Sequence, residues 1–340
     1  MTILGRIFTA VFVALKSFVN TLIDPGEVTE KETYKRRSHS DDSFASNSVS
    51  DSSSGSSPGE VPEEDPKEEM TAEKWYLRAK ALAGSGRLKE ACEAAEEALE
   101  LGVQDDRGCR ELLVSVYEGL GWLDLAIRQM RLLADREPDN HHLRLRLAEI
   151  LMKRPGEARS VIQELVKASE AQPESSEVHG MLGAMYYTVG ELENARFEFL
   201  ELERLAKHNV ERLLPAILGL ARIHLDSGEY DDAQSQVDAA LGLSPGNELA
   251  TILLSYLLTA KGLYQDAIDA LDKIHPSGEY RSLYLCTKGY GMVGLDKPEE
   301  ALNCFKEAAG LDPDLTEAHH GLSIVYSILG KPGLADLETG

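Results

Sequence analysis

One run of glycines is the segment of the sequence that most resembles a motif with chemistry of its own. Residues 289–294 read Gly-Tyr-Gly-Met-Val-Gly and match the GxGxxG pattern of dinucleotide-binding turns. That pattern holds a pyrophosphate where a strand precedes the glycines and a helix begins at them. Here the spacing to Ala301, Phe305 and Pro313 places the glycines inside the first helix of a repeated helix pair. We therefore predict no dinucleotide site and no cofactor.

Histidine, cysteine and carboxylate residues are present, but their spacing does not indicate a reaction centre. The pairs His141-His142 and His319-His320 are adjacent, and neighbours on a helix point about 100° apart, so they cannot share a metal ion. The cysteines at positions 92, 109, 286 and 304 form no CxxC pair, and we predict buried thiols. With 58 acidic residues in the chain, paired carboxylates carry no catalytic signal. We predict no catalytic or metal site and no enzymatic activity.

The net charge of the chain restricts its partners. It is −23 at pH 7, whereas proteins that bind a phosphate backbone carry clustered lysine and arginine. Strong acidity favours solubility and basic partners. Nucleic acid is therefore not an expected partner, and other proteins are.

The composition divides the chain into three parts. Residues 25–70 are rich in Ser, Asp and Glu and contain few large aliphatic residues, so they cannot bury enough apolar surface to fold. We predict that they form a disordered linker. Residues 71–340 are rich in Ala, Leu and Glu, which are strong helix formers. Residues 1–24 form a separate, strongly apolar segment.

The apolar N-terminal segment sorts its residues by face when it is placed on a helix. Arg6 and Lys16 fall on a polar side, and Asp24-Pro25-Gly26 ends the helix. The apolar surface contains Ile7, Phe8, Val11, Phe12, Leu15, Phe18, Val19 and Leu22. This pattern predicts an amphipathic helix that anchors the chain to a membrane.

Four roles remain open for this predicted helix. It can lie in the plane of the headgroups, or span the bilayer as a segment of about 20 residues with Lys16 well inside it. A cleaved signal peptide lacks a clear small-x-small cleavage site, and the fourth role is packing on the rest of the chain or on a partner. The basic residues Lys31, Lys35, Arg36 and Arg37 follow closely. They predict attachment at the cytoplasmic face of a membrane, either peripherally or through a single span.

A period of about 34 residues runs through the rest of the chain. Its mark is a glycine, a Leu or aromatic residue two positions later, and an alanine three positions after that. The mark begins at Gly86, Gly121, Gly190, Gly228 and Gly262. Successive alanines from Ala91 to Ala267 lie 35, 69, 38 and 34 residues apart, so the double interval predicts a degenerate repeat around residues 154–158.

Further residues hold the same phase. Prolines close second helices at Pro138, Pro245 and Pro313, and small residues occupy the site where first helices approach, as at Gly183 and Gly289. Together these marks resemble the consensus of the tetratricopeptide-repeat (TPR) family. The resemblance implies an all-α, right-handed solenoid of about seven helix-turn-helix repeats with a capping helix. The expected ranges are 72–106, 107–140, 141–175, 176–213, 214–247, 248–281 and 282–315, followed by Thr316 to Leu329 as the cap.

The resemblance also implies a binding surface, because the first helices of TPR repeats line a concave groove. In repeats 1–3 the groove positions are mixed in charge: Tyr76, Lys80, Glu111, Glu118, Arg146, Glu149 and Lys153. In repeats 4–7 they are mostly apolar or aromatic: Met181, Tyr187, Leu218, Arg222, Ile252, Leu253, Tyr256, Cys286, Tyr290 and Val293. An apolar groove suits a helix or extended segment with hydrophobic anchors. Alternatively, several of these residues pack between helices.

These observations predict a non-catalytic, membrane-associated adaptor or scaffold that binds partner proteins in the groove. Two alternatives remain. One is a structural scaffold that self-assembles through its ends, which Ile324 and Ile328 on the capping helix suggest. The other is a soluble adaptor associated with a chaperone or a secretion system.

Overall fold

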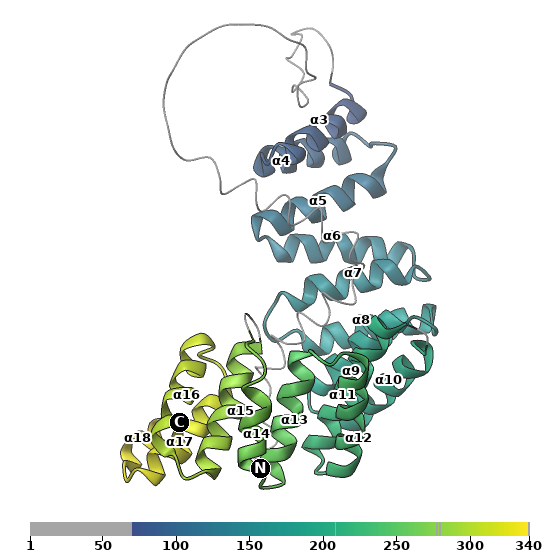
Figure 1. The fold of residues 1–340 in the computed structure, drawn as a ribbon. Helices are drawn as coiled ribbons and strands as arrows, with labels where there is room; N and C mark the ends of the chain where they lie inside the picture. The colour runs from purple at the N-terminus through teal and green to yellow at the C-terminus, as the bar shows by residue number, and fades with distance from the viewer. Residues whose placement is uncertain (1–69, 208, 277, 279, 339–340) are drawn as a thin grey trace, which may run out of the picture. The chain divides into compact units, whose positions relative to one another are not determined.

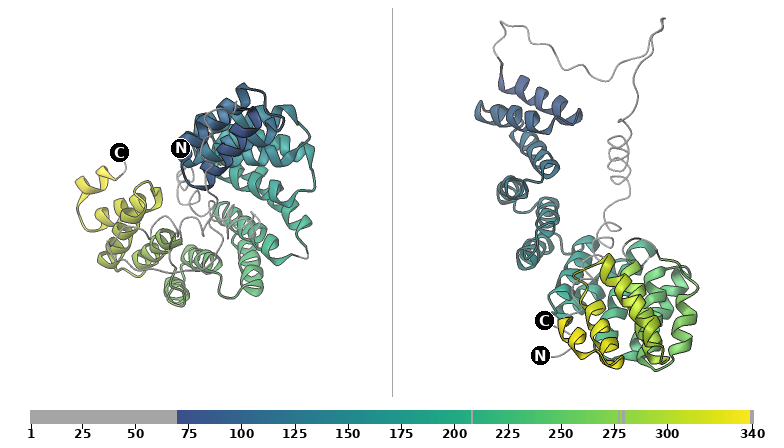
Figure 2. Two further views of the ribbon diagram at one scale, coloured as in Figure 1. Left: turned by 90° about the horizontal axis from the view of Figure 1, so that it is seen from above. Right: turned by 90° about the vertical axis from the view of Figure 1, so that its left-hand side faces the viewer.

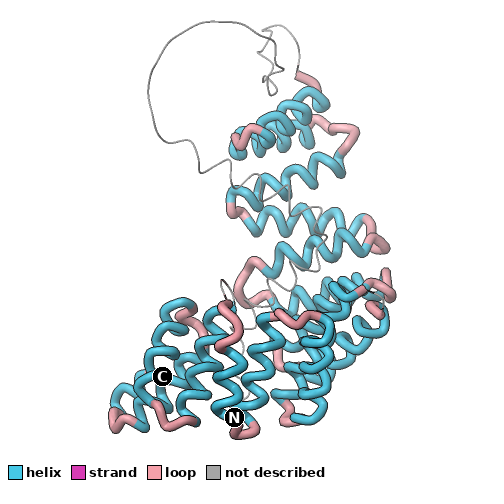
Figure 3. Tube along the Cα trace, in the orientation of Figure 1, coloured by secondary structure: helices cyan, strands magenta, loops and turns pink. Residues whose placement is uncertain are grey.

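The structure is a computed structural model that describes residues 70–338 apart from positions 208, 277 and 279. The predicted anchor helix at 1–24 and nearly all of the predicted linker at 25–70 lie outside the described residues. Within the described part of the chain the regular secondary structure is helical and contains no strand (Figure 3). None of the helices described is both long and apolar enough to cross a membrane.

The chain divides into two compact units. We call residues 70–173 the first unit and residues 174–338 the second unit, and each is described by itself. The first unit contains three helix pairs (Figure 1). Their bounds are α3 Ala72–Gly84, α4 Leu88–Glu100, α5 Asp106–Leu120, α6 Leu123–Arg136, α7 His141–Met152 and α8 Ala158–Ala171.

The second unit contains five helix pairs (Figure 1). Their bounds are α9 Ser176–Thr188, α10 Leu192–Leu205, α11 Val210–Asp226, α12 Tyr230–Leu243, α13 Glu248–Ala260, α14 Tyr264–Leu271, α15 Tyr280–Gly294, α16 Pro298–Leu311, α17 Thr316–Ile328 and α18 Pro332–Leu337. Seven full pairs confirm the predicted repeats. The expected single capping helix is instead the first helix of an eighth pair, because the short α18 packs against α17.

The recurring glycine of the sequence mark ends the first helix of a pair. Gly121 has a φ of 75° directly after α5, a left-handed conformation that suits glycine. In that conformation its N–H bonds to the carbonyl of Glu118, and the N–H of Trp122 bonds to the carbonyl of Tyr117 at 2.8 Å. The chain thereby reverses direction, and the second helix begins two residues after the glycine. In the seventh pair Asp296 takes this place with a φ of 60°.

The interval of 38 residues between two marks has a local explanation. Helix α11 begins at Val210 rather than at the predicted residue 214, so it is about one turn longer than its neighbours. The side chain of Asn209 accepts the N–H of Arg212 at 3.3 Å and caps the added turn.

Glycines in the first helices make room for phenylalanines of the second helices. A Cβ at Gly183 would lie 2.9 Å from the ring of Phe199, and one at Gly219 would lie 2.6 Å from the same ring. Phe305 has the same arrangement, with a Cβ at Gly289 falling 2.7 Å and one at Gly321 2.3 Å from its ring. Each ring therefore contacts the first helix of its own pair and the first helix of the next.

The GxGxxG motif is explained by the same kind of close packing. Its glycines lie within α15, so no helix begins at them. Gly289 faces Phe305, a Cβ at Gly291 would lie 2.9 Å from Ile268, and one at Gly294 would lie 2.2 Å from the ring of Tyr264. The three glycines thus accommodate three neighbouring side chains.

The first helices of the second unit form one continuous layer. Helix α9 contacts α11, α11 contacts α13, α13 contacts α15, and α15 contacts α17. Seen from above, the pairs of this unit follow an arc (Figure 2). A row of adjacent first helices presents one side chain after another to the same surface, and that surface contains the candidate site.

Candidate functional site

Polar and aromatic side chains of the first helices converge on one surface of the second unit. We call this surface the inner face and define it by Tyr187, Arg222, Asp226, Tyr256, Tyr290, Val293 and Glu317. Burial tends to lower the pKa of the Arg222 guanidinium, but Tyr187, Asp226 and Glu317 raise it well above its ordinary value. The first helices of neighbouring pairs pack against one another, whereas the second helices that the structure describes do not pack in this way. The first helices therefore lie on the concave side of the arc that the pairs of this unit follow (Figure 2).

A buried hydrogen-bond network holds one end of the inner face. The hydroxyl of Tyr187 donates to Oδ2 of Asp226, and Nε of Arg222 lies 3.0 Å from the Tyr187 hydroxyl and 3.4 Å from the same Asp226 oxygen. The side chains of Arg222 and Asp226 are only 11% and 6% exposed. Burial raises the pKa of Tyr187, so its hydroxyl keeps its proton and remains a donor. The network ties α9 to α11 and fixes the position of the guanidinium.

Two tyrosines continue the inner face along the row. The guanidinium carbon of Arg222 lies 5.7 Å from the ring centroid of Tyr256, within cation–π range. The hydroxyl of Tyr290 donates to the backbone carbonyl of Glu317 at 3.0 Å and lies 3.1 Å from Nδ1 of His320. Both tyrosine side chains are partly exposed. They present aromatic surface, and the hydroxyl end of Tyr290 is held in place.

Several carboxylate oxygens beside the inner face have no partner among the described residues. They are Oδ1 of Asp226, Oδ2 of Asp312 and both oxygens of Glu317, and all four are shielded from solvent. Burial raises the pKa of Glu317, while the positive charge of Arg222 opposes that shift. A buried acceptor without a donor is unfavourable. These carboxylate oxygens are therefore acceptors for which the described residues supply no donor.

The structure separates the predicted groove residues into two groups. Met181, Ile252 and Leu253 are each 1% exposed and Leu218 is 7% exposed, so these four pack between helices. Cys286, at 1% exposure, is also interior. Here the structure differs from the predicted open groove, because helix-to-helix contact covers side chains at these positions. Tyr187 is buried too, at 9% exposure, so the groove prediction rests on Arg222, Tyr256, Tyr290 and Val293 of the inner face.

Sequence reasoning did not single out Asp226 and Glu317. The position of each residue in the repeat nevertheless indicates its role. Asp226 lies four residues after Arg222, which is one helical turn and within reach of an ion pair. Glu317 is the second residue of its repeat, which is itself one of the positions that face a TPR groove. A search for charged residues at every groove position would have found both.

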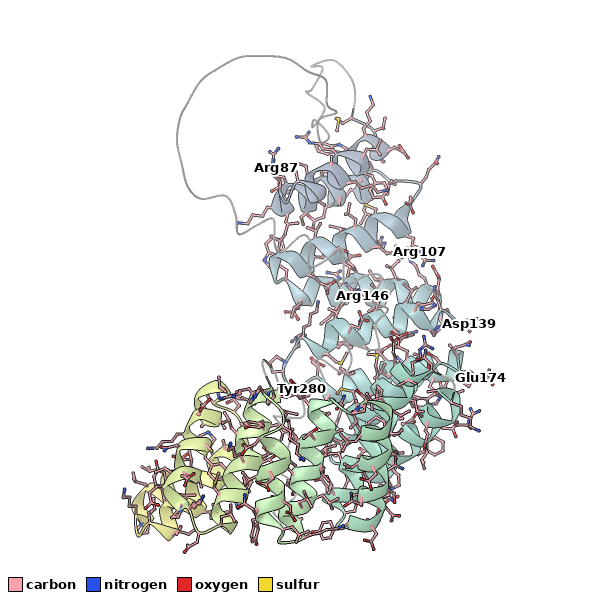
Figure 4. All side chains as sticks on the ribbon, in the orientation of Figure 1. Arg87, Arg107, Asp139, Arg146, Glu174 and Tyr280 are labelled. Atoms are coloured by element: carbon pink, nitrogen blue, oxygen red, sulfur yellow. The ribbon has the colours of Figure 1, made fainter. Side chains whose placement is uncertain are left out.

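In the first unit the predicted groove residues pair with one another. Glu118 accepts hydrogen bonds from Arg146 at 2.5 Å and from Lys153, and Arg146 also contacts Glu149 at 2.7 Å. Figure 4 labels Arg146 among the side chains of this unit. At the other end, the ammonium of Lys80 lies 3.9 Å from the ring centroid of Tyr76. Local pairing satisfies these charges, so positive and negative groups are balanced on this surface. On the inner face of the second unit they are not.

A buried ion pair in the first unit was not expected from the sequence. Nη1 of Arg144 lies 2.8 Å from Glu164, and the two side chains are 7% and 8% exposed. The pair joins α7 to α8 in the degenerate third repeat. It serves a structural role, because both charges are inside the pair of helices.

One cluster in the second unit has the residue types of a cation site. His224, Glu229 and Asp232 bring ligand atoms within 4.8 Å of one another. However, Glu229 already contacts His224 at 2.5 Å and Arg196 at 2.9 Å. An ion would have to displace this guanidinium, so we assign no metal to the cluster.

Comparison with known proteins bears directly on the helix pairs. Models of the tetratricopeptide repeat match residues 72–101 and residues 218–280. These two segments are tetratricopeptide repeats. TPR solenoids are scaffolds for protein–protein interaction and in general are not catalytic. No curated protein sequence matches the chain.

Solved TPR structures share the fold of the chain at low sequence identity. A tetratricopeptide repeat protein from Parabacteroides merdae ATCC 43184 is 16% identical with a TM-score of 0.60, covering 75% of this chain and 98% of that one. The APC/C hetero-tetramer Cut9-Hcn1 gives 17% identity and a TM-score of 0.53, covering 78% of this chain and 51% of the other. The human IFIT1 dimer with m7Gppp-AAAA gives 16% identity and a TM-score of 0.51, covering 80% of this chain and 68% of the other. At such identities the likeness shows the fold alone.

Substitutions in the buried network test its contribution to the inner face. Replacing Asp226 by Asn leaves the buried Arg222 without its ionic partner, and we expect a loss of about 3 kcal/mol in the free energy of unfolding. Tyr187→Phe is the matched control, because it removes the two hydrogen bonds of the hydroxyl and keeps the ion pair, at a cost of about 1–2 kcal/mol. Urea denaturation followed by circular dichroism measures both. Equal costs for the two variants would contradict the network described here.

Proposed function

We propose that this TPR protein is a non-catalytic adaptor that binds partner proteins on the inner face of the second unit. The observation that carries the proposal is the run of partly exposed side chains across consecutive first helices: Arg222, Tyr256, Tyr290 and Val293. Aromatic and arginine side chains dominate the binding energy of many protein interfaces. Fixed tyrosines also lose little conformational freedom when a partner binds.

The chemistry of the inner face defines the class of partner. Apolar and aromatic surface favours a helix or an extended segment with hydrophobic anchors. The carboxylates of Asp226 and Glu317 favour a lysine or arginine between those anchors. The preferred ligand is therefore an amphipathic segment with a basic residue, and the net charge of −23 steers basic partners toward the chain.

The second part of the proposal is that the adaptor works at the cytoplasmic face of a membrane. It is supported by the sequence of residues 1–24 and the basic residues that follow. These residues lie outside the described part of the chain, so the argument is one of sequence pattern. Apolar side chains on one helical surface, with Arg6 and Lys16 on the other, suit insertion into the headgroup region.

Co-sedimentation with liposomes tests the membrane attachment. We expect anionic vesicles to pellet the full chain and not residues 25–340, which retain every described helix. Loss of binding at high salt would identify attachment to the lipid surface, because salt screens the contribution of the basic residues. Binding that resists salt would identify a spanning helix. If neither protein pellets, the membrane proposal is wrong and a soluble adaptor remains.

A self-assembling scaffold is the second candidate function. Ile328, Leu334 and Leu337 are 51%, 43% and 76% exposed near the last helix pair. Exposed apolar residues on a terminal repeat favour contact with a second copy. Light scattering over a concentration series should then show a mass that rises with concentration. A constant monomer mass would rule this candidate out.

A further inference from the structure

The inner face of the second unit has carboxylates in excess over their cation. Asp226 contacts Arg222 at 3.4 Å, and the charges of Asp226 and Asp312 both raise the pKa of Glu317, so three carboxyl groups interact around one guanidinium. Asp226 is the most enclosed, with a side chain that is 6% exposed and an Oδ1 without a donor among the described residues. The carboxylates of this surface thus lack at least one positively charged partner within the described chain. Its aromatic side chains lack an apolar group there that packs on their exposed sides.

The N-terminal segment of the same chain has the complementary character. Between Ile3 and Leu22 it contains two charged residues, Arg6 and Lys16, and both are cations. The rest of the segment is mainly apolar, and Phe8, Phe12 and Phe18 are its aromatic residues. A concave surface can contact more than one side of a helix, so it can receive the apolar residues and a cation together.

We infer that the inner face of the second unit binds residues 3–22 of its own chain as a helix. Lys16 supplies the cation that approaches Glu317 and Asp226. The phenylalanines of the segment pack against Tyr256, Tyr290 and Val293. The cation would pair with the carboxylates and the apolar residues would cover the tyrosines, which the described residues leave without partners of this kind.

The length of chain between the segment and the helices permits this contact. Residues 23–69 span more than ~100 Å when extended. Eight helix pairs at a spacing of about 10 Å cover less than that distance. A tether of this length also keeps the segment at an effective concentration near ~1 mM, so a weak contact suffices.

The inference rests on the proposal that the inner face binds a helical segment, and it identifies the first ligand of that face. A segment held there is not available to a membrane, and the face is not available to another protein. Partner binding and membrane attachment therefore become coupled. A partner on the inner face releases the segment to the membrane, and a membrane that binds the segment frees the inner face for a partner.

Hydrogen exchange of the full chain tests the inference. We compare α13, α15 and α17 in residues 1–340 and in residues 25–340, and expect about tenfold slower exchange in the full chain. Lys16→Glu and Glu317→Lys should each remove this difference, and the double variant should restore it by reversing the pair. Glu299→Lys, an exposed change on α16, is the matched control and should leave the protection intact.

The outcomes separate this inference from the proposed function. Equal exchange with and without residues 1–24, or protection that ignores both charge reversals, would overturn the inference and leave the liposome result standing. Protection that fades on dilution would also overturn it, because the segment would then come from a second copy. Glu317→Gln guards against a misfolded lysine variant and should weaken the protection at least ~3-fold, as expected when a charged hydrogen bond becomes neutral.

Discussion

The packing of a phenylalanine against two glycines is the contact on which the second unit depends. Phe305 is fully buried, and its ring touches Gly289 of its own pair and Gly321 of the next. Phe199 does the same between Gly183 and Gly219. No other residue type allows the helix backbone to come so close to the ring, because any Cβ would fall within 3.0 Å of it. One side chain thereby fixes the spacing between three helices.

This spacing determines what the inner face can do. When consecutive first helices are held side by side, residues at equivalent positions form a row, so Arg222, Tyr256 and Tyr290 follow one another. The ninth position of the repeat supplies all three, and the hydrogen bonds of Tyr187 and Tyr290 each join neighbouring first helices. The site is therefore a property of the helix packing. Its chemistry comes from a few polar residues on a regular frame.

The fold could be predicted from the sequence because the repeat marks report local requirements. The left-handed turn favours a glycine, as at Gly121, and the alanine five residues later is fully buried, as at Ala126. The site was less accessible, because a groove position does not reveal whether a neighbour covers it. Met181 and Ile252 occupy predicted groove positions, as Tyr256 does, yet they are buried. The network around Asp226 joins it to Tyr187, 39 residues earlier in the chain. A local sequence pattern does not show that two such distant residues meet.

A double-mutant cycle between Gly321 and Phe305 tests most directly whether this packing organises the unit. In the natural background Gly321→Ala should lower the free energy of unfolding by about 1–3 kcal/mol, because the added methyl group meets the ring. In the Phe305→Leu background the same change should be neutral or stabilising, since alanine favours a helix by about 1 kcal/mol over glycine. Gly310→Ala, which meets no neighbouring atom within 4 Å, should stabilise the protein in both backgrounds. An equal cost of Gly321→Ala in the two backgrounds would contradict the account.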